Sequence, residues 1–192
     1  MNSINELFTE VNRRTQGAFK AFFALVQVFR SRVLSTRLKA NLYKVMVRPI
    51  LLYGCESWSL TSVLERKLQV AENRMLRWIT GPVYDHKRGF WKGRPNAELR
   101  EKCSINLVSS EISARRLQWA GHVARMDERR APRVVMEARV AGRRSRGRPR
   151  KRWMDLVRHE SLEQGVVAWK VVAQDRPRWR QVVKTAKGLT GS

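Results

Sequence analysis

Acidic side chains and cysteines are both scarce in this sequence. Its 192 residues contain 16 Asp or Glu against 40 Lys or Arg, which gives a formal net charge of +24 at pH 7 and an isoelectric point near 11.5. A basic excess of this size is typical of proteins that bind a polyanion such as nucleic acid. The two cysteines, Cys55 and Cys103, are too few for a disulfide framework, so we expect a reducing compartment.

Long apolar runs are missing as well. The longest candidate, residues 45–55, contains Arg48 and Pro49 and falls short of the roughly 20 apolar residues that a membrane-spanning helix needs. The N-terminus lacks the charged and then apolar order of a signal peptide. We therefore expect a protein that is neither membrane-bound nor secreted, located in the nucleus or in a cytoplasmic ribonucleoprotein.

The residue types that build metal and catalytic sites are sparse too. His86, His122 and His159 lie far apart, without the ligand spacing of a zinc site. The sequence has no Walker-type phosphate loop and no Gly-x-Ser-x-Gly motif. Two-metal nucleotidyl transfer needs clustered carboxylates, whereas the aspartates here are isolated and never paired. We therefore expect no catalytic residue, no metal site and no cofactor in this chain.

What the sequence does contain is helical periodicity. Apolar or small residues recur every three or four positions over residues 4–29, 38–46, 64–78, 112–126, 153–157 and 179–183. Ser35 or Thr36, Ser62 and Asn96 are the expected N-caps, and Gly81 with the proline after it is an expected helix end. No segment shows a convincing strand alternation. The sequence therefore predicts an all-α fold.

Two details of this pattern concern buried faces. In the helix that starts near residue 36, Leu38, Leu42, Val45 and Met46 are expected to face the core. In the helix that starts at residue 62, the expected buried positions include Leu64, Leu68, Ala71, Met75 and Trp78.

Composition divides the chain into four parts. We expect a helical bundle over residues 1–81 and a loop with a helical extension over residues 82–131. A short helix and a basic, Arg-rich linker follow over residues 132–152, and a C-terminal helical tail over residues 153–192.

The linker holds the densest basic cluster. Seven of the ten residues 143–152 are basic and none is acidic: Arg143, Arg144, Arg146, Arg148, Arg150, Lys151 and Arg152. Mutual repulsion, two nearby glycines and Pro149 favour an extended strand that fits a phosphate-lined groove. The core Arg146-Gly147-Arg148-Pro149 also has the chemistry of a minor-groove reader. A solvated linker or a nuclear-import signal is the plainer alternative.

Basic residues elsewhere are second candidates for nucleic-acid contacts. Arg74, Arg77, Arg115 and Arg116 lie on predicted helices, where they either contact a duplex or form an ordinary solvated face. The pair Phe90-Trp91 lies between basic residues in the predicted loop. It suits stacking on unpaired bases, although we favour an interpretation in which it pins the loop to the core.

Four segments resemble, in order and spacing, the C-terminal region of non-LTR (LINE-type) retrotransposon reverse transcriptases. They are residues 51–58 (LLYGCESW), 115–126 (RRLQWAGHVARM), 147–155 (GRPRKRWMD) and 175–180 (DRPRWR). Together they extend over most of the chain. The resemblance implies that residues 1–81 form a thumb-like bundle that grips template and primer, followed by a basic extension.

The catalytic part of that family has no counterpart here. In that family the palm's aromatic-x-Asp-Asp turn holds the catalytic metals, so the resemblance implies Mg²⁺ for the parent enzyme only. This turn is absent here, as are the fingers, the endonuclease and a Cys/His zinc knuckle. The resemblance thus implies a fragment of a polyprotein or a decayed copy, inactive alone as an RNA-directed DNA polymerase. Its expected partners are RNA, RNA–DNA hybrid or DNA, and the palm of the parent polyprotein.

Two other functions remain open at this point. One is a free-standing chromatin or minor-groove DNA-binding protein that uses Arg146-Gly147-Arg148-Pro149. The other is a helical interaction module without a nucleic-acid role, which would leave the charge of +24 unexplained.

Overall fold

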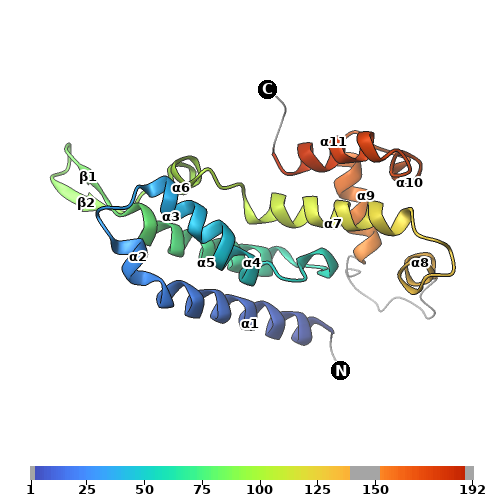
Figure 1. The fold of residues 1–192 in the computed structure, drawn as a ribbon, viewed down its shortest axis with the longest axis horizontal. Coiled ribbons are helices and arrows are strands. Elements are labelled where there is room, and N and C mark those ends of the chain that lie inside the picture. The colour runs from blue at the N-terminus through green and yellow to red at the C-terminus, as the bar shows by residue number, and fades with distance from the viewer. Residues whose placement is uncertain (1–2, 139–151, 189–192) are drawn as a thin grey trace. The chain divides into compact units, whose positions relative to one another are not determined.

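The computed structural model describes residues 3–138 and 152–188, apart from the side chains of residues 3–5 (Figure 1). Helices dominate the described chain, so the predicted all-α class is confirmed, with one small β-hairpin as the exception. The chain folds as two compact units. Unit 1 comprises residues 1–53 and 60–109, and unit 2 comprises residues 54–59 and 110–192. The four-part division by composition stays a prediction.

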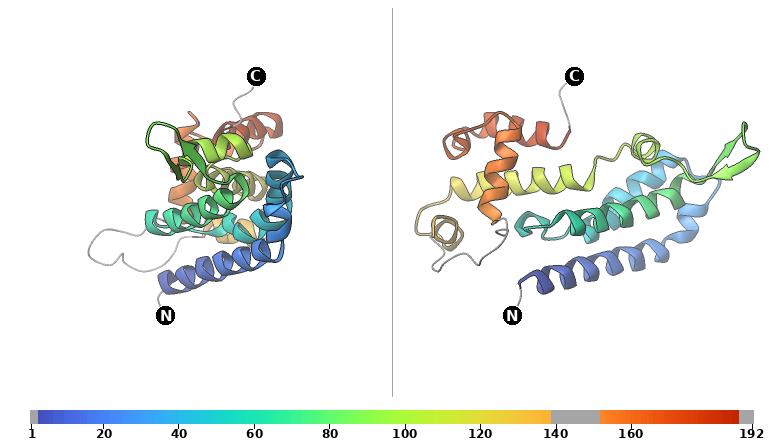
Figure 2. Two further views of the ribbon diagram at one scale, coloured as in Figure 1. Left: turned by 90° about the vertical axis from the view of Figure 1, so that its left-hand side faces the viewer. Right: turned by 180° about the vertical axis from the view of Figure 1, so that it is seen from behind.

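Unit 1 is built on two long helices. Its helices are α1 (Ser3–Ala24), α2 (Val26–Arg30), α3 (Thr36–Leu42), a π-helical turn (Tyr43–Val47), α4 (Arg48–Leu51), α5 (Ser62–Thr80) and α6 (Asn96–Cys103). Helix α1 packs along α5 and α4, while α3 and α6 also pack against α5 (Figure 2). The predicted periodicity of α1 is confirmed at Val11, Ala18 and Phe22, which are fully buried.

The buried face predicted for the second helix is wrong. Leu38, Val45 and Met46 are 45%, 74% and 48% exposed, whereas Tyr43 and Val47 are fully buried. This segment is apolar on several sides, so two helical faces fit the spacing equally well. The polar group of Tyr43 decides between them, because its hydroxyl donates to Glu72 Oε1 at 3.3 Å in the interior.

A buried charge pair fixes the same region. Arg48 Nε donates to Glu72 Oε1 at 2.9 Å, and Arg48 Nη2 donates to the carbonyl of Asn106 at 2.8 Å. Burial raises the pKa of Tyr43 well above its usual range, and the negative charge of Glu72 adds to the effect. The Tyr43 phenol therefore stays protonated and serves as a hydrogen-bond donor.

The prediction for α5 is largely confirmed. Leu64, Leu68 and Met75 are buried, and Gly81 ends the helix with a φ of +68°. The N-cap is one residue earlier than predicted, because the Thr61 side chain, not that of Ser62, accepts from the backbone N–H of Leu64.

Trp78 was expected in the core but is 38% exposed. The cap predicted for α6 is wrong as well. Asn96 is the first residue of that helix rather than its cap, and its side chain accepts a hydrogen bond from Arg77.

Residues 83–95 were predicted as a loop, and the structure places a hairpin there. Strands β1 (Val83–Asp85) and β2 (Phe90–Lys92) pair antiparallel. Three-residue strands are too short to show alternation in sequence. The turn is set by the Asp85 side chain, which accepts the backbone N–H groups of Lys87 and Arg88.

Unit 2 packs short helices on α7. Its helices are most of α7 (Val108–Ala124), α8 (Ala131–Glu137), α9 (Trp153–Glu163), α10 (Trp169–Val172) and α11 (Arg176–Ala186), with a 3₁₀ turn at Cys55–Ser57. The core collects apolar side chains from α7, α9, α10 and α11, among them Leu117, Val157, Trp169 and Trp179. Within the described ranges, none of the helices is long and apolar enough to cross a membrane.

Helices α7 and α11 approach closely at Gly121. The indole of Trp179 lies where a side chain at position 121 would be, and its Nε1 donates to the carbonyl of Leu117 at 3.0 Å. A helical glycine usually costs stability relative to alanine. Here it makes room for a buried tryptophan.

Candidate nucleic-acid interface

A groove of about 860 Å³ opens in unit 1 between α2, α3 and α5. Its walls include Phe29, Leu34, Trp78, Pro82 and Gly93, which contribute apolar or backbone surface. Six basic side chains line it: Arg30, Arg32, Lys39, Arg74, Arg77 and Arg94. Its lining contains no Asp or Glu. A concave surface that carries charge of one sign attracts and concentrates a ligand of the opposite sign.

Some of these cations have polar partners at the groove wall. Arg94 forms an ion pair with Glu98 and also donates to the carbonyl of Pro82 at 3.4 Å. Arg77 Nη2 donates to Asn96 Oδ1 at 2.7 Å, and because this acceptor is neutral, it orients the guanidinium without cancelling its charge. The groove therefore keeps a positive charge.

Aromatic rings support two of the arginines. The Arg30 guanidinium lies 4.6 Å from the centre of the Trp78 ring, and that of Arg74 lies 5.7 Å from the Phe19 ring. Phe23 packs edge-on against Trp78 with 6.0 Å between ring centres. A guanidinium stacked on a ring keeps its in-plane N–H donors free, so it is positioned in advance to hold a phosphate.

The structure brings Arg74 and Arg77 together, as their spacing on one helix suggested. It adds four cations that were not predicted from the sequence: Arg30, Arg32, Lys39 and Arg94. No local signal marks these four, because α2 and α3 reach the groove only through packing on α5, and Arg94 reaches it from the chain after β2.

Arg116 has a structural role and is not a surface contact. Its side chain is 2% exposed, forms an ion pair with Glu160 and donates to the carbonyl of Trp58 at 2.8 Å. Burial raises the pKa of Glu160, and the nearby Arg116 charge opposes this shift. An arginine held in the interior by two acceptors does not reach a phosphate, so Arg116 is not part of the interface.

The other residues predicted to contact nucleic acid differ in their exposure and in whether the structure describes them. Arg115 is half-buried and pairs with Glu111 at 3.0 Å. Arg152 is exposed at the start of α9, where its backbone N–H donates to Asp155 Oδ2 at 3.0 Å. The remaining candidates, Arg143, Arg144, Arg146, Arg148, Arg150 and Lys151, lie outside the described residues.

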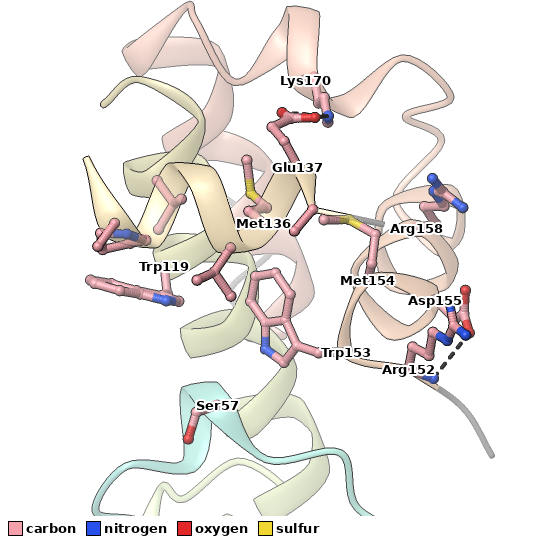
Figure 3. A pocket seen from close by; sticks show the side chains of 15 residues that line it. Ser57, Trp119, Met136, Glu137, Arg152, Trp153, Met154, Asp155, Arg158 and Lys170 are labelled. Atoms are coloured by element: carbon pink, nitrogen blue, oxygen red, sulfur yellow. Dashed lines mark hydrogen bonds and ion pairs between the residues drawn. The ribbon is translucent and has the colours of Figure 1, made fainter. Parts of the chain in front are cut away.

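Unit 2 contains a second hollow, of about 1230 Å³, lined by α7, α8 and α9 (Figure 3). Trp119, Met136 and Trp153 contribute its apolar surface. Its charged rim carries both signs, and Lys170 pairs with Glu137 there at 2.7 Å. A rim of mixed charge attracts a polyanion much less strongly than the uniformly basic groove of unit 1 does.

The four segments that carry the family resemblance contain residues that meet inside unit 2. Trp153 Nε1 donates to the carbonyl of Glu56 at 2.7 Å, which joins the third segment to the first. Arg116 from the second segment bonds to the carbonyl of Trp58 in the first. Trp179 from the fourth bonds to Leu117 in the second. These residues therefore specify the interior of unit 2.

Comparison with known proteins gives one informative similarity. A transposon-derived protein of Caenorhabditis elegans is 26% identical over 190 residues, which are 96% of this chain and 67% of that protein. No family model matches the sequence, and no solved structure matches it. The similarity supports a transposon-related origin for the chain.

Proposed function

We propose that the chain binds nucleic acid by its phosphate backbone, through the groove of unit 1 together with the basic segment 143–152. The observation that carries this proposal is the groove itself, whose wall is lined by six basic side chains, the buried Lys39 among them, and by no carboxylate. Phosphate contacts fix the position and orientation of a nucleic acid without reading its sequence. The expected activity is therefore a grip that depends on salt and tolerates many sequences.

We further propose that the chain is a C-terminal fragment of a retrotransposon reverse transcriptase, in which this grip holds template and primer. Three observations support the assignment. The four segments of the resemblance occur in register, residues from all four share contacts in unit 2, and the similar worm protein is transposon-derived. In this proposal polymerisation belongs to the palm of the parent protein, and this chain supplies affinity.

The groove is tested by neutralising two of its arginines. Arg74→Gln with Arg77→Gln is expected to lower the slope of log affinity against log salt by about 1 to 2 on duplex DNA, since each phosphate contact contributes about 0.9. Affinity near 0.1 M salt should fall about tenfold or more. Fluorescence anisotropy of a labelled duplex over a salt series measures both quantities.

A matched variant separates the groove from net charge. Arg66→Gln with Lys102→Gln also removes two exposed positive charges from unit 1, but neither residue lines the groove. This control should lose much less affinity than the groove variant. Equal losses would show that binding depends on total charge alone and would remove the groove from the proposal. Circular dichroism of both variants checks that the fold is retained.

A further inference from the structure

The β1–β2 hairpin presents aromatic rings to solvent. Tyr84, Phe90 and Trp91 are 37%, 47% and 67% exposed, so the prediction that Phe90-Trp91 pins a loop to the core is wrong. Tyr84 lies directly opposite Trp91 in the register, which places both side chains on one face of the hairpin. Their ring centres are 5.4 Å apart, and His86 adds a third ring 5.0 Å from Tyr84. The result is a row of three aromatic rings.

Basic side chains lie in the same hairpin, in the turn beside the row and on the opposite face. Lys87 and Arg88 are exposed in the turn, and Lys92 lies at the end of β2. The acid of the hairpin, Asp85, is engaged within it: Lys92 Nζ lies 2.8 Å from Asp85 Oδ2, and the turn N–H groups bond to Oδ1. The Lys92 hydrogen bond lowers the pKa of Asp85, so this carboxylate stays ionised as part of the turn.

The hairpin is continuous with the groove. Gly81 and Pro82, just before β1, line the groove, and so do Gly93 and Arg94, just after β2. Arg94 ties the two sides together by donating to the carbonyl of Pro82. Figure 2 shows the hairpin projecting beyond the end of α5. A nucleic acid held in the groove would therefore have the aromatic row at the edge of its site.

We propose that the Tyr84–Trp91 face stacks an unpaired base, so that the chain binds a junction between duplex and single strand. This inference rests on the proposed function. Stacking suits exposed aromatic rings, because every base has a π face, and the exposed Lys87 and Arg88 of the turn can bind the phosphates of the same strand. A duplex alone offers no such partner, since its base faces are already covered by their neighbours in the stack.

The test compares two labelled substrates that share one duplex of about 16 base pairs, one blunt and one with a single-stranded overhang of about six nucleotides. Trp91→Ala is expected to weaken binding to the overhang substrate about 5- to 100-fold and to change blunt-duplex binding less than about twofold. Trp91→Phe should restore most of the loss, because phenylalanine retains a stacking face.

The hairpin supplies its own control. Phe90 is an exposed aromatic on the opposite face, so Phe90→Ala should leave both substrates bound as in the unmodified chain. Equal losses for Trp91→Ala and Phe90→Ala on the overhang substrate would overturn the stacking proposal. So would a Trp91→Ala variant that loses as much affinity for the blunt duplex as for the overhang substrate. Failure of the proposed function looks different, because the unmodified chain would then bind both substrates weakly and without a salt dependence.

Discussion

Gly121→Ala is expected to destabilise unit 2 by about 3 kcal/mol or more, although alanine is the better helix former. A Cβ atom at this position would overlap Nε1 and Cδ1 of Trp179 and lie 2.8 Å from Cε2. The indole is 3% exposed and bonded to the carbonyl of Leu117, so it cannot move aside without losing that bond and its packing. Urea denaturation followed by circular dichroism measures the change in the free energy of unfolding.

A second helical glycine provides the matched control. At Gly17 in α1 an added Cβ would lie 3.4 Å from Ile50 Cγ2, which is an ordinary van der Waals distance. Gly17→Ala should therefore be neutral or stabilise the chain by up to about 1 kcal/mol. If Gly121→Ala were tolerated as well as Gly17→Ala, the close packing of α11 on α7 would be wrong, and with it the contact that joins two of the resemblance segments.

Replacing all seven basic residues of segment 143–152 by glutamine is expected to have the largest effect on binding. If each contacts one phosphate, the slope of log affinity against log salt falls by several units, and affinity near 0.15 M salt falls about 100-fold or more. The loss should be similar for all sequences, because phosphate contacts carry no sequence information. Filter binding or anisotropy over a salt series checks the expected change.

The control for this variant removes the same charge elsewhere. Seven exposed basic residues outside both the segment and the groove serve for it: Lys20, Arg37, Arg66, Lys102, Arg129, Arg130 and Lys184. The control chain carries the same net charge as the segment variant. A loss of slope as large in the control would show that segment 143–152 has no special role.

The sequence predicted helices well where one apolar face was unambiguous. In α5, Leu64, Leu68 and Met75 repeat on one side, and Gly81 supplies the positive φ that ends the helix. The α3–α4 region was misjudged because a wide apolar surface fits two faces. The buried face is determined by Glu72 of α5, because Tyr43 and Arg48 turn inward to bond to its carboxylate.

The candidate site was predictable only in part, for a physical reason. Arg74 and Arg77 are neighbours on one helix, so their clustering follows from local geometry. Arg30 and Arg94 join them only because distant elements pack on α5. The burial of Arg116 depends on Glu160, a partner 44 residues away in sequence. Local sequence carries no signal for contacts of this range.

The central claim, a phosphate grip that does not read sequence, is tested most directly by one salt series on the unmodified chain. Three duplexes of equal length suffice: A·T-rich DNA, G·C-rich DNA and an RNA–DNA hybrid. We expect log affinity to fall steeply and linearly with log salt on all three, with the hybrid bound at least as well as DNA. Strong A·T selectivity with weak hybrid binding would instead favour minor-groove reading by Arg146-Gly147-Arg148-Pro149. A flat salt dependence would contradict the account.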